Sequence, residues 1–537
     1  MTIGFDTFPL IYQLLTLVAA VSLGGWLFMA KSAGFSGNRF LFLASCLLFV
    51  LRLPVLVYNR ELNVDESQML AQAMTLAVDP VYWRSVDGTT GGPLSSYFLS
   101  IVGMLTGRYD YMTAHLGAFL LVLITLFFLF KALKNWFDPY RAALGLFPVV
   151  LFYGFTRTPD FVHYSSEHFP IALLAACVWL VSGDFVSDRS AKAKMFALGV
   201  LLTLVPFGKI QAVPLAAGIG LYALIRLATL RYRGALAALF GGVAAACASA
   251  LLLFFAGGVL NDFFTFYIKG NFQYKNDTTL FDNLRFQFSE AHRATDLLIL
   301  VVPLVIWPVL TVPGNRKVPR NRSVWWLGIG LLVMSFVAIL RTGSGYTHYL
   351  LFLVLPFSLL LTSLTGPGIS PANTRMRLIF PPLLGVALAV GVFWRQHGVL
   401  NSFVSGPGLN RGLPFTATGM EAARFLNKGE YMVVWGWNCQ YYVECQAPQG
   451  VAENHSIRSA FKHPMQETYR DRYLRDLERT RPAVLIDAVG PNSLWLQDTL
   501  TQSYRSFPEL ADYVDKNYTL IGRPGSDRLF VRNDLRP

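Results

Sequence analysis

The chain has 537 residues, of which 54% are hydrophobic and only 14% are charged, and its mean hydropathy is +0.44. Soluble domains usually carry about 25% charged residues, so this composition excludes an ordinary soluble protein and indicates an integral membrane protein. The formal net charge of +13 does not indicate nucleic-acid binding. The basic residues are spread over short loops between apolar runs, which is typical of cytoplasmic anchoring loops.

Apolar runs recur along most of the chain, and a run of about 20 such residues can cross a bilayer as a helix. They are continuous rather than alternating, which favours helices over barrel strands. No cleavable signal sequence is evident at the start, so we expect the first span to be retained with the N-terminus outside. The twelve predicted spans are 9–30, 40–58, 112–131, 142–157, 168–184, 195–208, 210–228, 234–258, 295–312, 324–340, 349–365 and 378–394.

Basic residues recur in every second loop between these spans, which by the positive-inside rule places those loops in the cytoplasm. They are Lys31 and Arg39; Lys131, Lys134 and Arg141; Arg189, Lys192 and Lys194; Arg226, Arg231 and Arg233; Arg316, Lys317, Arg320 and Arg322; and Arg375 and Arg377. The remaining loops face outward and are longer and richer in acids, aromatic residues, His and Gly. Long polar loops on one face of a scaffold usually carry function. The outer set comprises 59–111, 156–169, the turn at Lys209, 259–294, 341–348 and the chain after Arg395.

The composition changes after the last span, and we expect two domains, 1–394 in the membrane and 395–537 outside it. The second part has the strand-like stretches "YMVVWGW" and "PAVLIDA" and the helical stretches "GMEAARFLNK" and "MQETYRDRYLRDLERT", which together predict a small α/β domain. Cys439 and Cys445 fall in this domain, where an oxidising compartment would permit a disulfide. Their spacing does not prove the bond, so the disulfide and the free thiols both remain open.

The stretch "NVDESQ" places Asp65 and Glu66 side by side shortly after the second span. One interpretation is a helix start, with Asn63 as the cap and Glu66 completing a capping box. The following residues Met69, Ala73 and Leu76 form an apolar stripe suited to the membrane surface. The other interpretation is an active site. This interpretation is supported by the charged and His residues, and by the Gly and Pro residues that keep backbone close to a ligand, in the same and the next outer loop. They are Arg84, Asp87, Gly88, Gly91, Gly92, Pro93, Asp160, His163, Glu167 and His168.

Four features together resemble the GT-C glycosyltransferases. They are Asp-Glu after an early span, a Gly/Pro-rich return in the first outer loop, "PFGKIQAVP" between two short spans, and "YTHYLLFLVLPFSLL" entering a late span. The likeness is greatest to the protein O-mannosyltransferase and aminoarabinose-transferase branch (family 39-like), and it covers about residues 40–394. It implies a polytopic α-helical membrane protein with about twelve transmembrane helices and a C-terminal α/β domain on the outer face. In a bacterium this would be the inner membrane.

The resemblance also implies an activity. Members of this family move a sugar from a polyprenyl-phosphate carrier to a hydroxyl acceptor, which here would be a glycan, a lipid or a protein. Asp65 is then the general base, because the attacking hydroxyl must lose its proton as the new bond forms. Glu66, Asp160 and Glu167 are the other candidate catalytic acids, and either Asp160 or Glu167 is the second carboxylate of the site.

Cations must meet the negative charge that grows on the leaving phosphate. Five outer residues are candidates for this role: Arg84, Lys209, Lys269, Arg341 and His348. Each also has an ordinary explanation. Lys209 suits a lysine that extends to the membrane surface, Arg341 and His348 suit a re-entry turn, and Lys269 suits an interfacial aromatic belt. Arg52, within a span, is explained equally by extension to the surface and by function.

We expect no required metal, because basic side chains can neutralise a monophosphate leaving group. A divalent metal is nevertheless possible, since His163 and His168 lie close to the acids, although no tight ligand spacing demands one. The alternative function is a transporter or lipid flippase. Transporters usually carry polar residues near the bilayer midplane and internal repeats, and neither is evident in the sequence. A scaffold whose outer domain binds a partner would leave the acidic loop unused.

Overall fold

The computed structural model describes residues 9–30, 32, 34–156, 158–183, 188–273, 278–289, 291–311, 321–341, 343–365, 379, 383–387 and 412–535. Most of the predicted twelfth span, 378–394, lies outside these residues. So do several basic residues assigned to the inner loops: Lys31, Arg316, Lys317, Arg320, Arg375 and Arg377.

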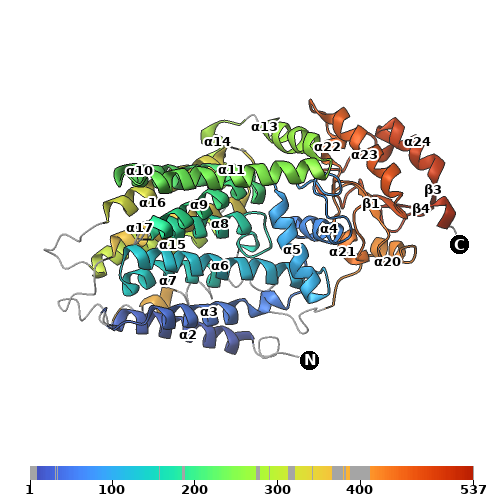
Figure 1. Cartoon of the computed structure of the whole chain (residues 1–537). Helices are drawn as coiled ribbons and strands as arrows, with labels where there is room; N and C mark the ends of the chain where they lie inside the picture. Colours follow the sequence, from blue (N-terminus) through green and yellow to red (C-terminus); the bar gives the residue numbers. More distant parts are fainter. Residues whose placement is uncertain are drawn as a thin grey trace.

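A bundle of long apolar helices makes up most of the molecule (Figure 1). Each of the first eleven predicted spans coincides with helical structure. Within the described residues, eight helical segments are long and apolar enough to cross a membrane, so the chain is a multi-pass membrane protein, while the count of twelve stays a prediction. The bundle comprises α2 (Pro9–Met29), α3 (Gly37–Leu56), α6 (Tyr111–Trp136), α7 (Pro139–Phe155), α8 (His168–Ser182), α9 (Asp188–Gly208), α10 (Val213–Thr229), α11 (Arg233–Ala256), α15 (Ala291–Thr311), α16 (Arg322–Leu340) and α17 (Val354–Leu364).

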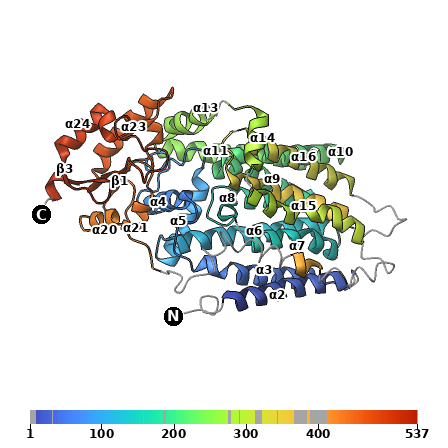
Figure 2. The ribbon, with the colours of Figure 1, turned by 180° about the vertical axis from the view of Figure 1, so that it is seen from behind.

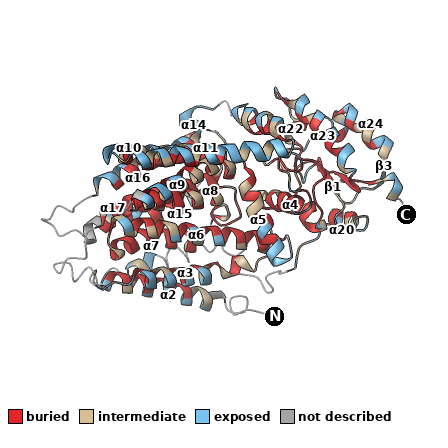
Figure 3. Ribbon diagram, in the orientation of Figure 1, coloured by how far each residue is buried: buried red, intermediate tan, exposed pale blue. Residues whose placement is uncertain are grey.

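The packing order explains which helices face lipid. Helix α11 packs along α9, α9 packs on α8, and α8 packs on α6. Consequently α11 is at the outside, where Leu252, Leu253 and Phe255 are exposed. Much of the α11 ribbon is pale blue, the colour of exposed residues, in Figure 3. By contrast, the 3-10 helix η4 (Thr347–Leu353) and α17 are almost completely buried. A buried segment therefore leads from one end of the bundle into its centre.

The first long loop folds into two helices at one end of the bundle, α4 (Val64–Val78) and α5 (Pro93–Thr106). Helix α4 starts as predicted, with the Asn63 side chain accepting a hydrogen bond from the backbone N–H of Asp65 at 2.9 Å. The predicted capping box is wrong, because Glu66 Oε2 accepts from the N–H of Leu62 instead of Asn63. The predicted position on the membrane surface is also wrong: Met69, Ala73 and Leu76 are buried.

Residues 412–535, which we call the C-terminal unit, form the expected α/β structure beyond α4 (Figures 1 and 2). Its sheet has the order β1-β2-β4-β3, in which β1 (Met432–Trp435) and β2 (Val484–Asp487) are parallel and the other neighbours are antiparallel. The last two strands are β3 (Tyr518–Gly522) and β4 (Arg528–Arg532). The helices of the unit are α20 (Ala417–Ala423), α21 (Gln440–Cys445), α22 (Ile457–Ala460), α23 (Gln466–Thr480) and α24 (Pro508–Asn517).

Each face of this sheet has its own apolar cluster. One side of β1 and β2 packs with α23 and α24 in a core that includes Trp435, Leu477 and Leu510. The other side belongs to a cluster that also contains Leu70 of α4 and Ala114 of α6. The C-terminal unit therefore shares hydrophobic core with the helices of the first loop, and burial of this apolar surface holds the two together.

A buried guanidinium reinforces this junction. Arg472 of α23 lies between two carboxylates, with Nη2 at 2.7 Å from Asp87 Oδ2 of the first loop and 3.6 Å from Glu453 Oε1 of the C-terminal unit. Its guanidinium also stacks over the Phe266 ring at 3.6 Å. Phe266 belongs to the π-helix η3 (Phe263–Lys269), so one side chain joins three segments that are distant in sequence.

The two cysteines of the C-terminal unit are free thiols. Cys439 precedes α21 and Cys445 ends it, a helical rise of about 9 Å. Disulfides need Cα atoms within about 7 Å. Each Sγ instead contacts a backbone carbonyl, Cys439 that of Asn454 and Cys445 that of Gly419. The structure therefore decides the open question in favour of free thiols.

Candidate active site

A cavity with an interior of about 210 Å³, open to solvent, lies where the helix bundle meets the C-terminal unit. Its bundle side is lined by Asn63, Asp65 and Gln68 of α4, by residues 88–91, by Asp160, Ser166 and Lys209, and by Tyr346, His348 and Tyr349. Its opposite side is lined by Trp437, His455, Ile457, Arg458, Leu494 and Trp495 of the C-terminal unit.

Glu167 and Lys209 form a buried ion pair at the bundle side of the cavity, and their side chains are 0% and 4% exposed. Lys209 Nζ also donates to Ser166 Oγ at 2.7 Å and lies 4.8 Å from the centre of the Tyr349 ring. Burial alone would raise the pKa of Glu167, but the charges of Lys209 and His348 and the hydrogen bond to Lys209 together outweigh burial and lower the pKa to about 2. Glu167 is thus ionised at every physiological pH.

His348 connects this pair with Asp65. Its Nε2 lies 3.8 Å from Glu167 Oε1 and 4.0 Å from Asp65 Oδ2. The Asp65 side chain is 35% exposed and accepts a hydrogen bond from Gln68 Nε2 at 3.0 Å. Asp65 therefore keeps a carboxylate that a ligand in the cavity can reach, whereas Glu167 is completely enclosed.

Asp160 is held beside the start of α4, where Asn63 Nδ2 donates to its Oδ1 at 2.7 Å. Burial would raise the pKa of this carboxyl group, but the nearby His163 and His348 and the hydrogen bonds from Asn63 and Thr347 together outweigh burial and lower the pKa. Asp160 and Asp65 therefore line one cavity as neighbouring acids, as expected for two loops that meet at the same end of the bundle.

A close backbone contact sets the position of Lys209. The N–H of Gly92 donates to the carbonyl of Gly208 at 3.0 Å, and Gly91 pairs with Lys209 as an isolated β-bridge. A Cβ atom on Gly92 would lie 2.2 Å from the carbonyl oxygen of Phe207, so only glycine fits there. The "GGP" and "FGK" stretches thus fold against each other, which turns the lysine into the cavity.

Glu66 does not reach the cavity, although it directly follows Asp65. Its buried carboxylate accepts hydrogen bonds from the N–H groups of Leu62 (2.8 Å) and Tyr164 (3.0 Å) and lies 3.1 Å from His115 Nε2. Successive helical residues point about 100° apart, so the two neighbours face different surroundings. Glu66 fixes the second acidic loop to α4, and we no longer assign it a catalytic role.

Three of the five candidate cations also lie away from the cavity. Arg84 is 43% exposed and forms an ion pair with Asp79. Lys269 is exposed at the end of η3. Arg341 is exposed after α16, with its guanidinium 5.9 Å from the centre of the Phe272 ring. Of the five, only Lys209 and His348 line the cavity.

Sequence reasoning missed the part of the site that the C-terminal unit supplies. Arg458 is a second strong cation in the cavity lining, and Trp437, His455 and Trp495 are aromatic groups on the same wall. These residues are hundreds of positions away from Asp65, and no local pattern indicates that they meet it. The signals in the sequence are the aromatic stretches "WGWNCQYYVEC" and "FPELADYVDKNY", which suit either a sugar-facing surface or a small core.

Asp65, His163 and His348 form one group with the composition of a metal site, and their ligand atoms all lie within 4.8 Å of one another. Nε2 of His163 and Nδ1 of His348 are buried with no hydrogen-bond partner among the described residues. Two imidazoles and a carboxylate suit Zn²⁺ or a similar borderline cation. The group could accommodate such an ion, whereas the expectation that none is required stays a prediction.

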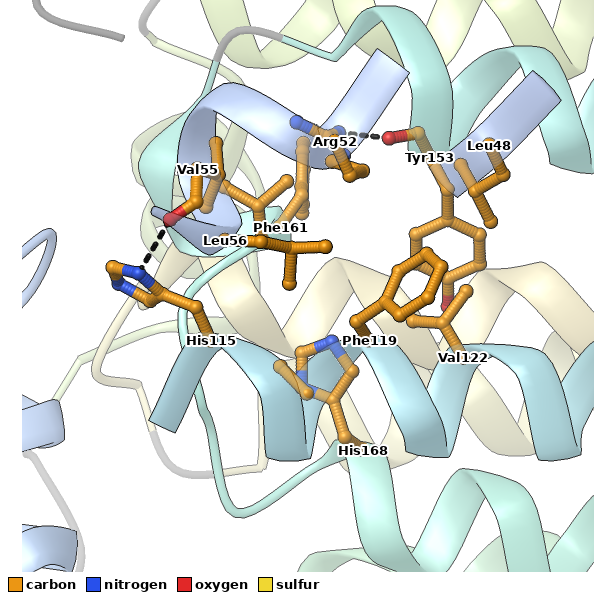
Figure 4. A pocket seen from close by; sticks show the side chains of 12 residues that line it. Leu48, Arg52, Val55, Leu56, His115, Phe119, Val122, Tyr153, Phe161 and His168 are labelled. Carbon is orange, nitrogen blue, oxygen red and sulfur yellow. Dashed lines mark hydrogen bonds between the residues drawn. The ribbon is translucent and has the colours of Figure 1, made fainter. Parts of the chain in front are cut away.

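A second, much smaller pocket lies inside the bundle (Figure 4), with an interior of only about 20 Å³. Its walls are mainly apolar. Arg52 and His115 each hydrogen-bond there to a backbone carbonyl, of Tyr153 and Val55 respectively. Arg52 is only 8% exposed. It therefore does not extend to the membrane surface, and none of our nine candidate site residues lines this pocket.

The sequence analysis also overlooked a buried acid in the predicted span 295–312. The Asp296 carboxylate is completely buried and accepts hydrogen bonds from the hydroxyls of Thr156 and Thr158, both at 2.7 Å. It also accepts from the N–H of Thr158 at 3.1 Å. Asp296 thereby fixes the start of the loop that carries Asp160, which is a structural use of a charge near a helix end.

No known family model matches the chain, and no curated protein matches its sequence. Among solved structures, the chain is similar to ArnT from Cupriavidus metallidurans bound to undecaprenyl phosphate. Their identity is 13%, the alignment covers 94% of this chain and 100% of that one, and the TM-score is 0.54. The apo state of the same ArnT gives 14% identity, 93% and 99% coverage and a TM-score of 0.54.

These comparisons define the class of fold. The chain shares the fold of these ArnT structures, a multi-pass helical bundle with a C-terminal α/β unit at one end, and the fold expected from the sequence motifs is thereby confirmed. The similarity extends over almost the whole chain, including the C-terminal unit.

Proposed function

We propose that this protein is an inverting glycosyltransferase that moves a sugar from a polyprenyl-phosphate carrier to a hydroxyl acceptor. The observation that carries the proposal is the cavity in which a reachable carboxylate, Asp65, lies beside two histidines and opposite a cation, at the end of a membrane bundle. Undecaprenyl phosphate, which is bound in the similar ArnT structure, supports a carrier of this kind.

The reaction is a single displacement. The acceptor oxygen attacks the anomeric carbon, its proton passes to Asp65, and the bond from the anomeric carbon to the phosphate oxygen breaks with the electron pair leaving on the phosphate. A carboxylate within hydrogen-bond reach can act as such a base. The 35% exposure of Asp65 leaves it accessible to an entering hydroxyl group.

Lys209 and Arg458 are the cations we assign to the leaving phosphate. Both line the cavity, Lys209 from the bundle and Arg458 from the C-terminal unit. Cations that are fixed where negative charge develops in the transition state typically make a large contribution to catalysis. Glu167 partly offsets the charge of Lys209 and positions its ammonium group, which gives this second acid an electrostatic role instead of proton transfer.

We also propose that the cavity faces the outside of the membrane. Asp65, Asp160, Lys209 and His348 all come from loops that the distribution of basic residues assigns to the outer face, and the structure brings them to one end of the bundle. Sugar-loaded carrier would then enter from the bilayer, and the acceptor would enter from the aqueous side.

The test is sugar transfer in membranes containing wild-type protein or Asp65→Asn, using a panel of radiolabelled polyprenyl-phosphate sugars. We expect one donor to support transfer, and Asp65→Asn to lose at least about a hundredfold in rate, the usual lower limit for general-base catalysis. Asp515→Asn is the matched control, since Asp515 is an exposed acid on α24 outside the cavity. Undiminished transfer by Asp65→Asn would refute the assignment.

A further inference from the structure

We propose that the wall formed by Trp437, His455 and Trp495 is a saccharide-binding platform that holds the sugar ring of the acceptor opposite Asp65. The acceptor would then be a glycan or a glycolipid headgroup. This inference rests on the proposed function, in which an acceptor hydroxyl enters the cavity. All three side chains line the cavity that contains Asp65.

The three rings form one fixed assembly. Trp437 stacks on His455 with ring centroids 4.5 Å apart and meets Trp495 edge to face at 5.0 Å. The neighbouring residue Trp435 has a different use, because it is completely buried in the core of the C-terminal unit. Trp437, in contrast, is only partly buried, at the edge of the other apolar cluster, and one side of it borders the cavity.

Backbone contacts hold these rings in place. The N–H of Trp437 donates to Ser493 Oγ at 2.9 Å, and Asn438 Nδ2 donates to the carbonyl of Asn492 at 3.0 Å, which ties the loop of Trp495 to that of Trp437. Trp495 itself is 53% exposed and has a backbone φ of 64°. A bulky residue in the left-handed region is strained, and such strain is concentrated at functional sites.

The platform is also linked to the proposed base. Asn454, next to His455, donates through Nδ2 to the carbonyl of Gln68 at 3.1 Å, and Gln68 donates through Nε2 to Asp65 Oδ1 at 3.0 Å. Two consecutive hydrogen bonds thus fix the position of the aromatic wall relative to the carboxylate. A ring resting on the wall would have a defined position relative to the base.

The chemistry of the wall selects a sugar. Nε1 of Trp437 and Nδ1 of His455 are buried and have no hydrogen-bond partner among the described residues. Such groups gain most from a ligand that supplies polar partners, because a buried donor left unsatisfied is costly. A sugar ring offers apolar C–H groups to the aromatic faces and hydroxyls to these nitrogens, whereas an acyl chain would leave them unsatisfied.

The position of the wall favours the acceptor over the donor sugar. The platform belongs to the C-terminal unit, beyond α4 and away from the apolar helices (Figure 1), while the carrier must remain in the bilayer and place its phosphate near Lys209. A saccharide on the platform therefore approaches Asp65 from the water-exposed side.

The first experiment measures binding of soluble saccharides to the purified full-length protein by saturation-transfer NMR. The probes are the methyl glycosides of glucose, galactose, mannose, N-acetylglucosamine and arabinose. We expect at least one to bind, and Trp437→Ala and Trp495→Ala to weaken it about tenfold, as loss of one or two aromatic contacts would. Trp437→Phe should retain part of the affinity. Phe415→Ala is the matched control, an exposed aromatic residue of the same unit outside the cavity.

Three results would overturn the platform: no binding of any glycoside, equal binding by wild type and both tryptophan variants, or an equal loss in Phe415→Ala. A second experiment tests whether the platform holds the donor sugar instead. It compares the affinity of the protein for sugar-loaded and for bare polyprenyl phosphate. If Trp437→Ala abolishes the difference in affinity between these two, the platform holds the donor sugar and the acceptor assignment is wrong. Asp65→Asn should still bind the glycoside, so failure of the proposed reaction and failure of the platform are observed separately.

Discussion

Lys209 shows how a buried charge can be both structural and functional. Its pair with Glu167 is almost completely enclosed, so removing either partner leaves a charge without compensation. Breaking a buried pair in this way usually costs about 3–5 kcal/mol, whereas replacing both charges is often nearly neutral. A single Lys209 variant would therefore mix instability with loss of function.

We accordingly predict different results for single and double variants. Lys209→Ala should lower the melting temperature strongly, and Lys209→Met combined with Glu167→Gln should recover most of it. The double variant should nevertheless raise the donor KM about tenfold or more, because a charged hydrogen bond to phosphate is lost. Thermal unfolding in detergent and donor titrations measure the two effects. Wild-type donor KM in the double variant would contradict the phosphate assignment.

Glu66, unlike its neighbour Asp65, is expected to affect stability and not the chemistry of transfer. Burial acts to raise the pKa of this carboxyl group, but His115, His163 and the N–H of Leu62 together outweigh burial and lower the pKa, so Glu66 is an ionised structural acceptor. In Glu66→Gln an amide N–H₂ group would face a backbone N–H, which costs about 1–3 kcal/mol. We predict lower thermal stability, compared with Glu421→Gln as a partly exposed control. A stable Glu66→Gln without transfer activity would restore the catalytic interpretation.

At the scale of elements, the contact between the start of α5 and the end of α9 places Lys209. Gly92→Ala would drive a methyl group into the Phe207 carbonyl and displace this turn. Overpacking of this kind costs about 1–3 kcal/mol, and we expect transfer to fall with it. Gly330 in α16 is the matched control, because a Cβ there meets no atom within 4 Å. Gly330→Ala should be neutral or stabilising by up to about 1 kcal/mol. Equal effects of the two substitutions would argue against the contact.

The junction between α23 and the first loop should depend on pH. Burial raises the pKa of Glu453 from 4.5 to about 8, although Arg472 acts to lower it. The folded state then holds a proton that the unfolded chain releases, so stability is greatest below the ordinary pKa and falls as the pH rises towards 8. We predict a lower melting temperature at about pH 9 than at about pH 5, and a smaller difference in Glu453→Gln. An unchanged difference would assign the pH effect to other groups.

Element by element, apolar runs and loop charges were sufficient to predict the first eleven spans as helical structure and to bring Asp65, Asp160, Glu167, Lys209 and His348 to one end of the bundle. These patterns could not predict the direction of individual side chains: Glu66 and Arg84 lie in the correct loop but form contacts outside the cavity. Nor could they predict contacts between distant segments, because the position of Arg458 and Trp437 depends on how the C-terminal unit docks.

For the molecule as a whole, the proposed orientation can be tested directly. In a variant without its five cysteines, we introduce Leu500→Cys, at an 88% exposed position of the C-terminal unit, or Ala193→Cys, at an exposed position of α9 near the opposite end of the bundle. A membrane-impermeant maleimide should label the first in intact cells and the second only after lysis. The reverse pattern would place the cavity in the cytoplasm.

The enclosed pair of Glu167 and Lys209 has a consequence for turnover. Once the sugar has been transferred, the spent carrier carries a phosphate with more negative charge than before, and a fully uncompensated lysine would retain it. Here Glu167 competes for the same ammonium group, so this lysine is already neutralised by its partner when the site is empty. We expect weak product inhibition by polyprenyl monophosphate, and rapid exchange of carrier between successive cycles.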